Sequence, residues 1–453
     1  MVLERNHVLI ISHDVVGERM AGPGIRYYHL ARVLSHEFLV TLAVPGDASR
    51  FDPQGFDLLC YPNGSSDTVR RAVRNSDVVV VPAVWVGSVL DHLSPSVDVV
   101  VDGYDPFVAE TLSLGTMDVA DLQRTLTQAY LVGDFFMCAS ERQRDWWLGL
   151  LEAHGRINSY TFGEDRSLRR LLDVVPFGVP EEPPHASQQV IRGIWPGVDA
   201  DDKVILWGGG LWPWLDPLTA VNAVAQVWEK RQDVRLIFPG TEHPNPSMKG
   251  IPTHNEAARE LAREEGLLDK AVSFGQWVPY DDWPNVLLES DVALALHYDT
   301  LEARLAFRSR MLDYIWAGLP IVATRGDATS DLVERHKLGT VVDYEDADAV
   351  AEAILRLLEI APGALSEQFA EARLALTWEQ AAQPLIEFYR HPRLAPDKAA
   401  LGDDLGSPFY VDNRRHLIKE RDRWRDLVRE YEAGRFMRTM RWLDRLAQRL
   451  WST

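Results

Sequence analysis

The sequence is poor in cysteine, in long apolar runs and in positive charge, and each shortage excludes a class of protein. Its two cysteines, Cys60 and Cys138, both lie in apolar runs. This excludes a disulfide scaffold and a cysteine-rich zinc site and predicts a reducing, cytoplasmic location. No run of 18 uncharged apolar residues occurs, so we expect no membrane-spanning segment. The 47 Lys and Arg against 67 Asp and Glu give a net charge of −20, which argues against a nucleic-acid partner, because phosphates require a basic surface.

What the sequence does contain is a long series of short apolar runs that alternate with helical patterns. Residues 179–199 interrupt this series with four prolines and two glycines, which is typical of a linker. We expect strands before the linker at 8–11, 38–44, 58–61, 77–81, 97–101, 135–138 and 174–175, and after it at 204–207, 234–238, 271–274, 292–296, 321–323 and 339–342.

Continuous apolar strands separated by helices predict parallel sheets that are covered on both faces. The expected fold class is α/β, with two Rossmann-like, doubly wound domains that face each other across a cleft and a helical C-terminal tail. We place the first domain at 1–179, the second at 180–378 and the helical extension at 379–453. Since ligands of such sheets bind at the carboxyl ends of strands, the loops that follow strands are the places to look for function.

Two loops of the first domain carry candidate residues. Gly22 and Gly24 precede a helical pattern that begins at residue 25, and a glycine turn at a helix N-terminus suits a phosphate. The alternative is a simple tight turn. Asp102 and Asp105 follow the strand expected at 97–101, where carboxylates suit the hydroxyls of a polar substrate or, as the alternative, cap the next helix.

Loops of the second domain offer groups for a nucleotide. The run of glycines at 208–210, with Gly209 and Gly210, lets backbone amides approach a ligand. Trp277 and Val278 follow another strand and suit a flat base, through stacking and main-chain hydrogen bonds.

The richest segment of the second domain begins at residue 297. Glu302 lies in a predicted loop, followed by Arg308, Arg310 and Asp313. The guanidinium fork matches phosphate oxygens, and a carboxylate at Asp313 suits a ribose diol. The alternative is a solvated ladder of salt bridges.

Residues 308–322 resemble a known signature. Their sequence, Arg-Ser-Arg-Met-Leu-Asp-Tyr-Ile-Trp-Ala-Gly-Leu-Pro-Ile-Val, is similar to the donor-binding segment of the GT-B glycosyltransferases of family 4. There a basic residue precedes an acidic residue by three positions, and Gly-x-Pro follows five positions later. Further similar segments, in family order, are Gly22-Pro23-Gly24, Val175-Pro176-Phe177-Gly178-Val179, the glycines at 208–210 and Gln276-Trp277-Val278-Pro279-Tyr280.

The resemblance implies a retaining transfer of a sugar from a nucleoside diphosphate donor to an acceptor, without a metal ion. It places the donor in the second domain and the acceptor in the first. Asp313 matches the residue that binds ribose, Arg310 the basic residue near the diphosphate, and Gly22 and Gly24 the loop that approaches the phosphates. The nucleotide sugar is a substrate, and no permanently bound cofactor is expected.

The sequence also departs from the family pattern. The family has two Glu separated by seven residues, whereas here Asp313 stands in place of the second and residue 305 is Leu, so we assign the first role to Glu302. The usual basic pair after the first strand of the second domain is absent, and Arg304 and Arg308 are expected to supply charge instead. Asp102 and Asp105 replace the usual His at the acceptor cleft, and we assign them to catalysis.

The acceptor expected from the resemblance is a glycan or a lipid-linked molecule, in the synthesis of a cell-envelope polysaccharide. Two other functions stay open: a non-catalytic subunit that binds nucleotide sugars within a glycan-synthesis complex, and a GT-B sugar-nucleotide epimerase.

The end of the chain has a charge opposite to that of the whole. Residues 414–453 hold 12 Lys and Arg against 6 Asp and Glu, and the helical pattern at 435–453 places apolar and basic residues on opposite faces. Such a helix suits an anionic membrane surface, here the cytoplasmic face. The alternative is packing on the body of the protein or on a second subunit.

Overall fold

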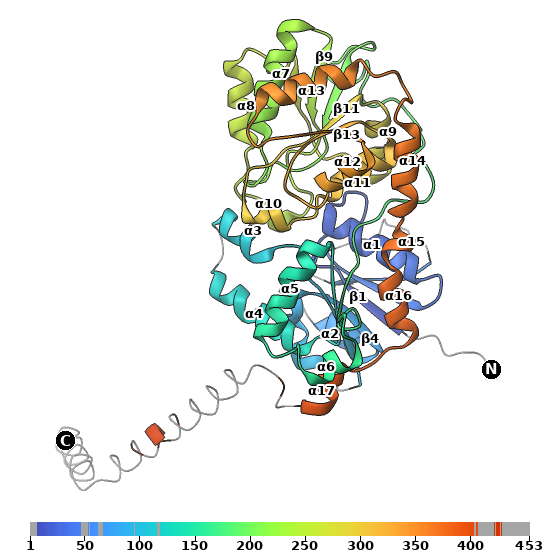
Figure 1. The fold of residues 1–453 in the computed structure, drawn as a ribbon, viewed down its shortest axis with the longest axis vertical. Helices are drawn as coiled ribbons and strands as arrows, with labels where there is room; N and C mark the ends of the chain where they lie inside the picture. Colours follow the sequence, from blue (N-terminus) through green and yellow to red (C-terminus); the bar gives the residue numbers. More distant parts are fainter. Residues whose placement is uncertain are drawn as a thin grey trace, which may run out of the picture.

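The computed structural model describes residues 7–46, 53, 55–61, 67–94, 96–115, 118–402, 405, 421, 423–425 and 427. The basic helix expected at 435–453 lies outside these residues. The described chain forms two lobes that are stacked along the long axis of the molecule (Figure 1). None of the helices among the described residues is long and apolar enough to cross a membrane.

The first lobe is built on a seven-stranded parallel sheet. The strand order is β3-β2-β1-β4-β5-β6-β7. The chain adds strands on one side of β1 up to β3 and then on its other side from β4, so the strand order reverses between β1 and β4. Strands β1, β4 and β5 run through the middle, and the valines of β4 are all fully buried. The strands are β1 (His7–Ile11), β2 (Leu39–Pro45), β3 (Asp57–Tyr61), β4 (Val78–Pro82), β5 (Asp98–Asp102), β6 (Phe135–Cys138) and β7 (Leu172–Val174).

The second lobe repeats this plan with a six-stranded parallel sheet in the order β10-β9-β8-β11-β12-β13. Its reversal lies between β8 and β11. The strands are β8 (Lys203–Trp207), β9 (Val234–Phe238), β10 (Val272–Phe274), β11 (Val292–Ala295), β12 (Ile321–Thr324) and β13 (Gly339–Val342). Both sheets therefore have the predicted strands and the predicted doubly wound order.

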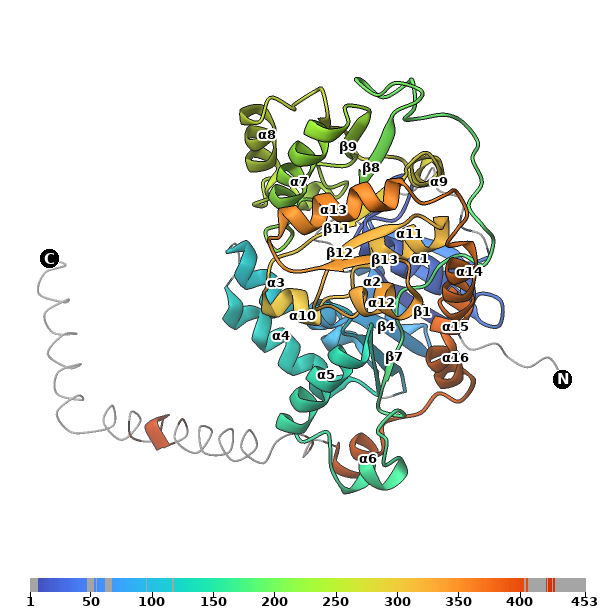
Figure 2. The ribbon, with the colours of Figure 1, turned by 45° about the horizontal axis from the view of Figure 1, so that its top comes forward.

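Helices cover both sheets, as the continuous apolar strands require. Figure 2 shows α7, α8 and α13 around the second sheet and α3, α4 and α5 beside the first. The helices of the first lobe are α1 (Gly22–Leu34), α2 (Asp67–Arg74), α3 (Phe107–Leu114), α4 (Val119–Val132), α5 (Glu141–Ala153) and α6 (Ser159–Glu164). Those of the second lobe are α7 (Pro217–Lys230), α8 (Asn255–Glu264), α9 (Trp283–Leu288), α10 (Leu301–Leu305), α11 (Ser309–Ala317), α12 (Ser330–His336) and α13 (Ala347–Leu358).

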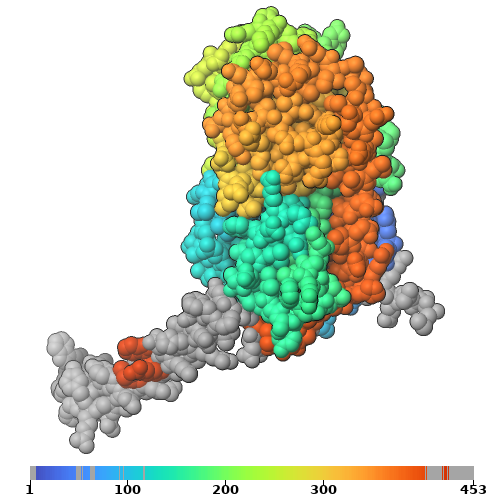
Figure 3. All heavy atoms as spheres, viewed as in Figure 1, coloured from blue at the N-terminus to red at the C-terminus, as the bar shows by residue number. Residues whose placement is uncertain are grey.

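The chain crosses between the lobes twice. The predicted linker at 179–199 contains no helix or strand, and Val179 forms a parallel bridge with Thr377, where the chain returns. The helices that follow α13 run down one side of both lobes (Figures 1 and 3). They are α14 (Ser366–Ala375), α15 (Trp378–Ala381), α16 (Gln383–Arg390) and α17 (Pro396–Leu401).

The C-terminal helices pack against the first lobe. The ring of Trp378 stacks on His29 of α1 at 4.8 Å between centroids, and Phe388 stacks on Phe135 at 5.1 Å. Asp397 of α17 forms a fully buried ion pair with Arg156, at 2.6 Å. Residues 378–401, which follow the second lobe in the sequence, therefore pack on the first lobe. The domain boundaries predicted at 179/180 and 378/379 stay predictions.

Candidate functional site

A cavity of about 450 Å³ lies between the lobes, at the carboxyl ends of the strands of both sheets. Its walls come from the loops after β1, β4 and β5 in the first lobe and after β8, β9 and β11 in the second. These loops flank the two points where the strand orders reverse, which is where open α/β sheets bind ligands. The cavity therefore lies between the two sheets, at the carboxyl ends of their strands, where the sequence predicted a cleft.

Two helix N-termini meet at this cavity. Helix α1 begins at Gly22 and α11 begins at Ser309; both residues line the cavity, and neither helix start has a side-chain cap. A Cβ atom built on Gly22 would lie 3.2 Å from the Ser309 hydroxyl oxygen, so the two helix starts almost touch. Free N–H groups and two helix dipoles converge there, which favours an anion.

Gly24, the second glycine of this loop, does not line the cavity. A Cβ atom there would lie 2.2 Å from the carbonyl oxygen of Val15, so the residue is required by the close packing of the turn. The phosphate interpretation therefore suits Gly22, and the tight-turn interpretation suits Gly24.

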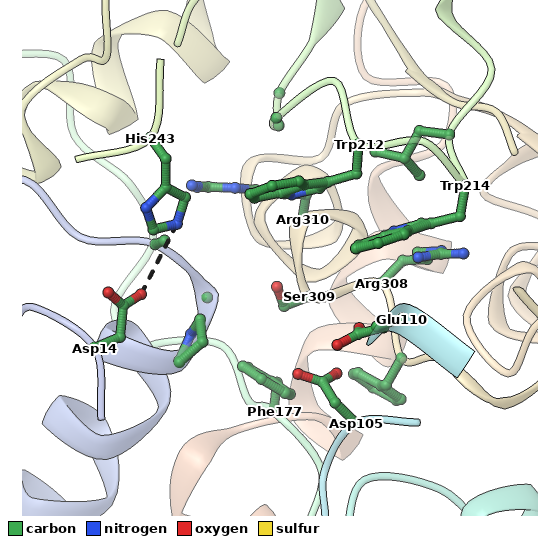
Figure 4. A pocket seen from close by; sticks show the side chains of 18 of the residues that line it. Asp14, Asp105, Glu110, Phe177, Trp212, Trp214, His243, Arg308, Ser309 and Arg310 are labelled. Atoms are coloured by element: carbon green, nitrogen blue, oxygen red, sulfur yellow. Dashed lines mark ion pairs between the residues drawn. The ribbon is translucent and has the colours of Figure 1, made fainter. Parts of the chain in front are cut away.

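Gly209 and Gly210 line the cavity from the loop after β8. The same loop carries Trp212 and Trp214, whose rings are nearly parallel, with centroids 5.6 Å apart and an angle of 14° between the planes. Both indoles line the cavity (Figure 4). The loop in which the sequence resemblance implies basic side chains therefore carries aromatic rings here.

Arg310 lines the cavity and is held in place by aromatic rings and a carboxylate. Its guanidinium donates to Asp313 at 3.1 Å and lies 5.0 Å from the ring centroid of Trp283 and 5.6 Å from that of Trp277. The Arg310–Asp313 contact along one face of α11 confirms the spacing seen in the sequence. The pair is only about a quarter exposed, unlike a solvated ladder.

Asp313 itself does not line the cavity. It also accepts a hydrogen bond from the Trp283 indole at 2.9 Å, and burial raises its pKa despite the opposing charge of Arg310. Trp277 lines the cavity, whereas Val278 lines a small adjoining recess together with Trp277 and Arg310.

Glu302 and Arg308 form a buried pair. Two parallel hydrogen bonds of 2.8 and 2.7 Å join them, and the Glu302 side chain is 1% exposed. Glu302 lies in the first turn of α10 rather than in a loop, because Thr300 caps a helix that the sequence did not indicate. Arg308 lines the cavity and Glu302 stands behind it; Arg304, also considered for charge, is exposed.

Asp105 and Glu110 line the cavity from the loop after β5 and from α3 (Figure 4). Burial, with the charge of Glu302, raises the pKa of Asp105 to about 7. Burial, with the charges of Asp105 and Glu302, raises the pKa of Glu110 well above its ordinary value. The carboxyl groups therefore form one acidic cluster, and neither Asp105 nor Asp102 caps α3, whose start has no side-chain cap.

Asp102 lies away from the cavity wall. It is fully buried and forms a two-bonded ion pair with the equally buried Arg26, at 2.7 and 3.1 Å. This position leaves no surface of Asp102 for a substrate to touch, so the geometry argues against the catalytic role predicted for it and favours a structural one.

Contacts across the cavity join the two lobes. Asp14, after β1, accepts a hydrogen bond from Asn245 at 2.8 Å and lies 3.9 Å from His243 (Figure 4). Burial lowers the pKa of His243, against the attraction of Asp14. The Tyr280 hydroxyl lies 2.6 Å from His29. The lobes are therefore held close around the cavity.

A pH dependence of stability follows from Asp105. Since its pKa is raised to about 7, the folded state retains a proton that the unfolded chain releases near pH 4. This group therefore makes the protein less stable as pH rises from about 4 to about 7. We expect Asp105→Asn to raise the melting temperature relative to the native protein, by more at pH 8 than at pH 5. The exposed Asp201→Asn is the control, and an Asp105→Asn difference that does not grow with pH would contradict the expectation.

Several lining residues were not assigned from the sequence: Glu110, Ser309, Trp212, Trp214 and His243. Ser309 was inside the recognised segment, and the two tryptophans in a loop of glycines were a usable signal. The sequence carried no comparable signal for Glu110 and His243, because the cavity is formed by loops that lie far apart in the sequence. Among the described residues, no group of three or more His, Cys, Asp and Glu has the geometry of a metal site.

Comparison with known proteins finds similarity in the second lobe and over the whole fold. Residues 202–360 match the family model described as glycosyl transferases group 1. A D-inositol 3-phosphate glycosyltransferase of Corynebacterium urealyticum is 28% identical over 206 residues, which are 45% of this chain and 46% of that protein. The enzyme of the same name from Mycolicibacterium smegmatis is 26% identical over 237 residues, 50% of this chain and 51% of that protein. The chain thus spans about half the length of the curated relatives it matches.

Solved structures show the same fold over most of the chain. Anabaena Alr3699/HepE, solved with UDP and glucose, superposes with a TM-score of 0.62 at 15% identity and covers 85% of this chain and 100% of that one. Sucrose-phosphate synthase from Thermosynechococcus elongatus gives 0.60 at 16% identity, with 85% and 98% covered. The predicted GT-B fold and the resemblance to GT-B glycosyltransferases are confirmed.

Proposed function

Because residues 202–360 match the glycosyl transferases group 1, we propose that this chain transfers a sugar from a nucleoside diphosphate donor to an acceptor bound in the same cavity. The observation that supports it best is the meeting of the uncapped N-termini of α1 and α11 at Gly22 and Ser309. Such an arrangement suits a diphosphate and the negative charge that develops on it as it leaves.

The donor is proposed to lie across this meeting point. Its diphosphate is placed at Gly22, Gly209, Gly210 and Ser309, with Arg310 as the cation. The nucleoside is placed toward the recess lined by Trp277 and Val278, with its ribose near Asp313. Uridine nucleotides are the first to test, since Alr3699/HepE was solved with UDP-glucose.

The proposed chemistry retains configuration at the anomeric carbon. The bond from this carbon to the leaving phosphate oxygen breaks while the bond to the acceptor oxygen forms on the same face, and the acceptor proton passes to the departing phosphate. The helix N-termini and Arg310 stabilise the phosphate charge without a metal ion in this scheme. Glu302 acts through Arg308, which it orients, and Asp105 faces the acceptor.

The acceptor is proposed to be a glycan or a lipid-linked molecule of a cell-envelope polysaccharide, used by a cytoplasmic enzyme at the membrane surface. The curated relatives are named for D-inositol 3-phosphate, which makes a phosphorylated polyol a second class of acceptor to test.

Binding of nucleotide sugars tests the proposal first. We expect one of UDP-, GDP-, ADP- and dTDP-glucose to raise the melting temperature, because a ligand that binds only the folded state stabilises it. Arg310→Ala should weaken that donor at least tenfold, about 1.5 kcal/mol for a charged hydrogen bond, as measured by calorimetry. The exposed Arg304→Ala is the matched control and should leave affinity unchanged.

The products distinguish the alternatives. Conversion of the donor sugar without an acceptor would identify an epimerase, and donor binding without turnover on any acceptor would identify a binding subunit. If no nucleotide sugar binds, or if Arg310→Ala binds the donor as well as Arg304→Ala does, the proposed site is wrong.

A further inference from the structure

The two sides of the cavity differ in charge. The anion-binding groups, namely the two helix N-termini and Arg310, gather around Gly22 and Ser309. In the view of Figure 4, Asp105 and Glu110 lie next to each other, on the opposite side of Ser309 from Asp14 and His243. Direct transfer requires both substrates in one cavity, so the acceptor must occupy volume that the diphosphate leaves free.

The charged side chains that the first lobe contributes to the wall are all acidic. They are Asp14, Asp105 and Glu110, and among the described lining residues this lobe supplies no Lys or Arg. Arg308, a cation that lines the cavity from the second lobe, is already bound by both carboxylate oxygens of Glu302, which stands behind the wall. A phosphate group on this side would face the carboxyl groups of Asp105 and Glu110 and no free cation. These groups, whose pKa values are raised, cannot neutralise the phosphate charge, and they repel it once they ionise.

The wall on the second-lobe side is aromatic. Trp212 and Trp214 lie nearly parallel to each other, and Figure 4 shows the Trp214 ring facing the side where Glu110 lies. Phe177 of the first lobe and Phe307 of the second also line the cavity, and their rings stack with centroids 5.8 Å apart. Flat apolar faces combined with a few hydrogen-bonding groups recognise the C–H face and the hydroxyls of a sugar or polyol ring.

We propose, on the basis of the proposed function, that the acceptor ring is an uncharged sugar or polyol held between the Trp212–Trp214 pair and the carboxyl groups of Asp105 and Glu110. Its hydroxyls donate to the carboxyl oxygens, and its C–H face packs on the indoles. A ring that carries a phosphate at this position is excluded by Asp105 and Glu110. These two residues therefore determine acceptor specificity.

Paired acceptors that differ by one phosphate test the proposal. The full chain, with the nucleotide sugar that binds it, is given myo-inositol or D-inositol 3-phosphate, and glucose or glucose 6-phosphate, with transfer measured by mass spectrometry. We expect transfer to at least one neutral ring, with kcat/KM at least tenfold above that of its phosphorylated counterpart. Preference for a phosphorylated acceptor, or transfer to no neutral ring, would overturn the proposal.

Conservative variants test the residues themselves. Glu110→Gln and Asp105→Asn keep the shape of the side chains, and each should raise the KM for the neutral acceptor at least fivefold while the donor KM changes less than twofold. At pH 8, where Asp105 is ionised, Asp105→Asn should lower the selectivity against the phosphorylated ring. Glu352→Gln, at an exposed position on α13, is the control. An unchanged acceptor KM in both variants would contradict the assignment.

Donor binding, measured by calorimetry on the same samples, distinguishes a failure of the proposed function from a failure of the proposed acceptor class. If the donor does not bind, the proposed function fails. If the donor binds and a phosphorylated acceptor is preferred, only the acceptor class fails.

Discussion

Replacement of Asp102 by alanine is expected to destabilise the first lobe by about 3–5 kcal/mol, because it leaves the buried Arg26 charge without a partner. Both side chains are 0% exposed, and two hydrogen bonds of 2.7 and 3.1 Å join them. The Arg26 guanidinium also lies 5.0 Å from the ring centroid of Phe177, so an aromatic face covers the buried charge. Urea unfolding of the full chain measures the loss.

A double variant separates the structural role from a catalytic one. Arg26→Met combined with Asp102→Leu removes both charges, and buried pairs replaced in this way commonly regain most of the lost stability. We expect the double variant to be more stable than Asp102→Ala and to retain transferase activity. If Asp102→Ala instead folds as stably as the native protein and loses activity, Asp102 is catalytic and the structural assignment is wrong.

Gly22→Asp is expected to weaken donor binding roughly 100-fold while leaving the protein folded. The position is the first residue of α1, where an acidic side chain favours the helix dipole and stabilises the helix. The same carboxylate would stand beside Ser309, where the diphosphate is placed. A charge at about 5 Å from a phosphate, with an effective dielectric constant near 20, costs about 3 kcal/mol, or roughly a 100-fold loss of affinity. Calorimetry with the donor measures it.

Gly22→Ala is the matched control for charge. A Cβ atom alone would lie 3.2 Å from the Ser309 hydroxyl oxygen, so the methyl group requires only a small shift. We expect the alanine variant to lose much less affinity than the aspartate variant, and the difference between them to shrink at high salt. Equal affinities for the two variants would place the diphosphate elsewhere.

The fold could be predicted because its signals are local. Strands such as β4 and β6 are unbroken apolar runs, which is typical of a sheet buried on both faces, and the helical patterns between strands imply parallel pairing. One local signal was overlooked: Thr300 begins the short helix α10, where the sequence indicated a loop around Glu302. A five-residue helix offers too little periodicity to be recognised.

The candidate site could be predicted only where its residues are neighbours in sequence. Arg310 and Asp313 are three positions apart on one helix, so their contact was evident. The buried ion pair of Asp102 could not be predicted, because its partner Arg26 lies 76 residues away. Glu110 could not be recognised, since the cavity wall that it shares with Asp105 and the indoles is assembled from loops of both lobes.

The central claim is that the N-termini of α1 and α11 together hold the diphosphate of a nucleotide sugar. A crystal structure of the chain with the donor that binds it tests this most directly. The account predicts phosphate oxygens about 3 Å from backbone N–H groups at Gly22 and Ser309, with Arg310 in contact. A donor bound with its diphosphate away from both helix starts would contradict it.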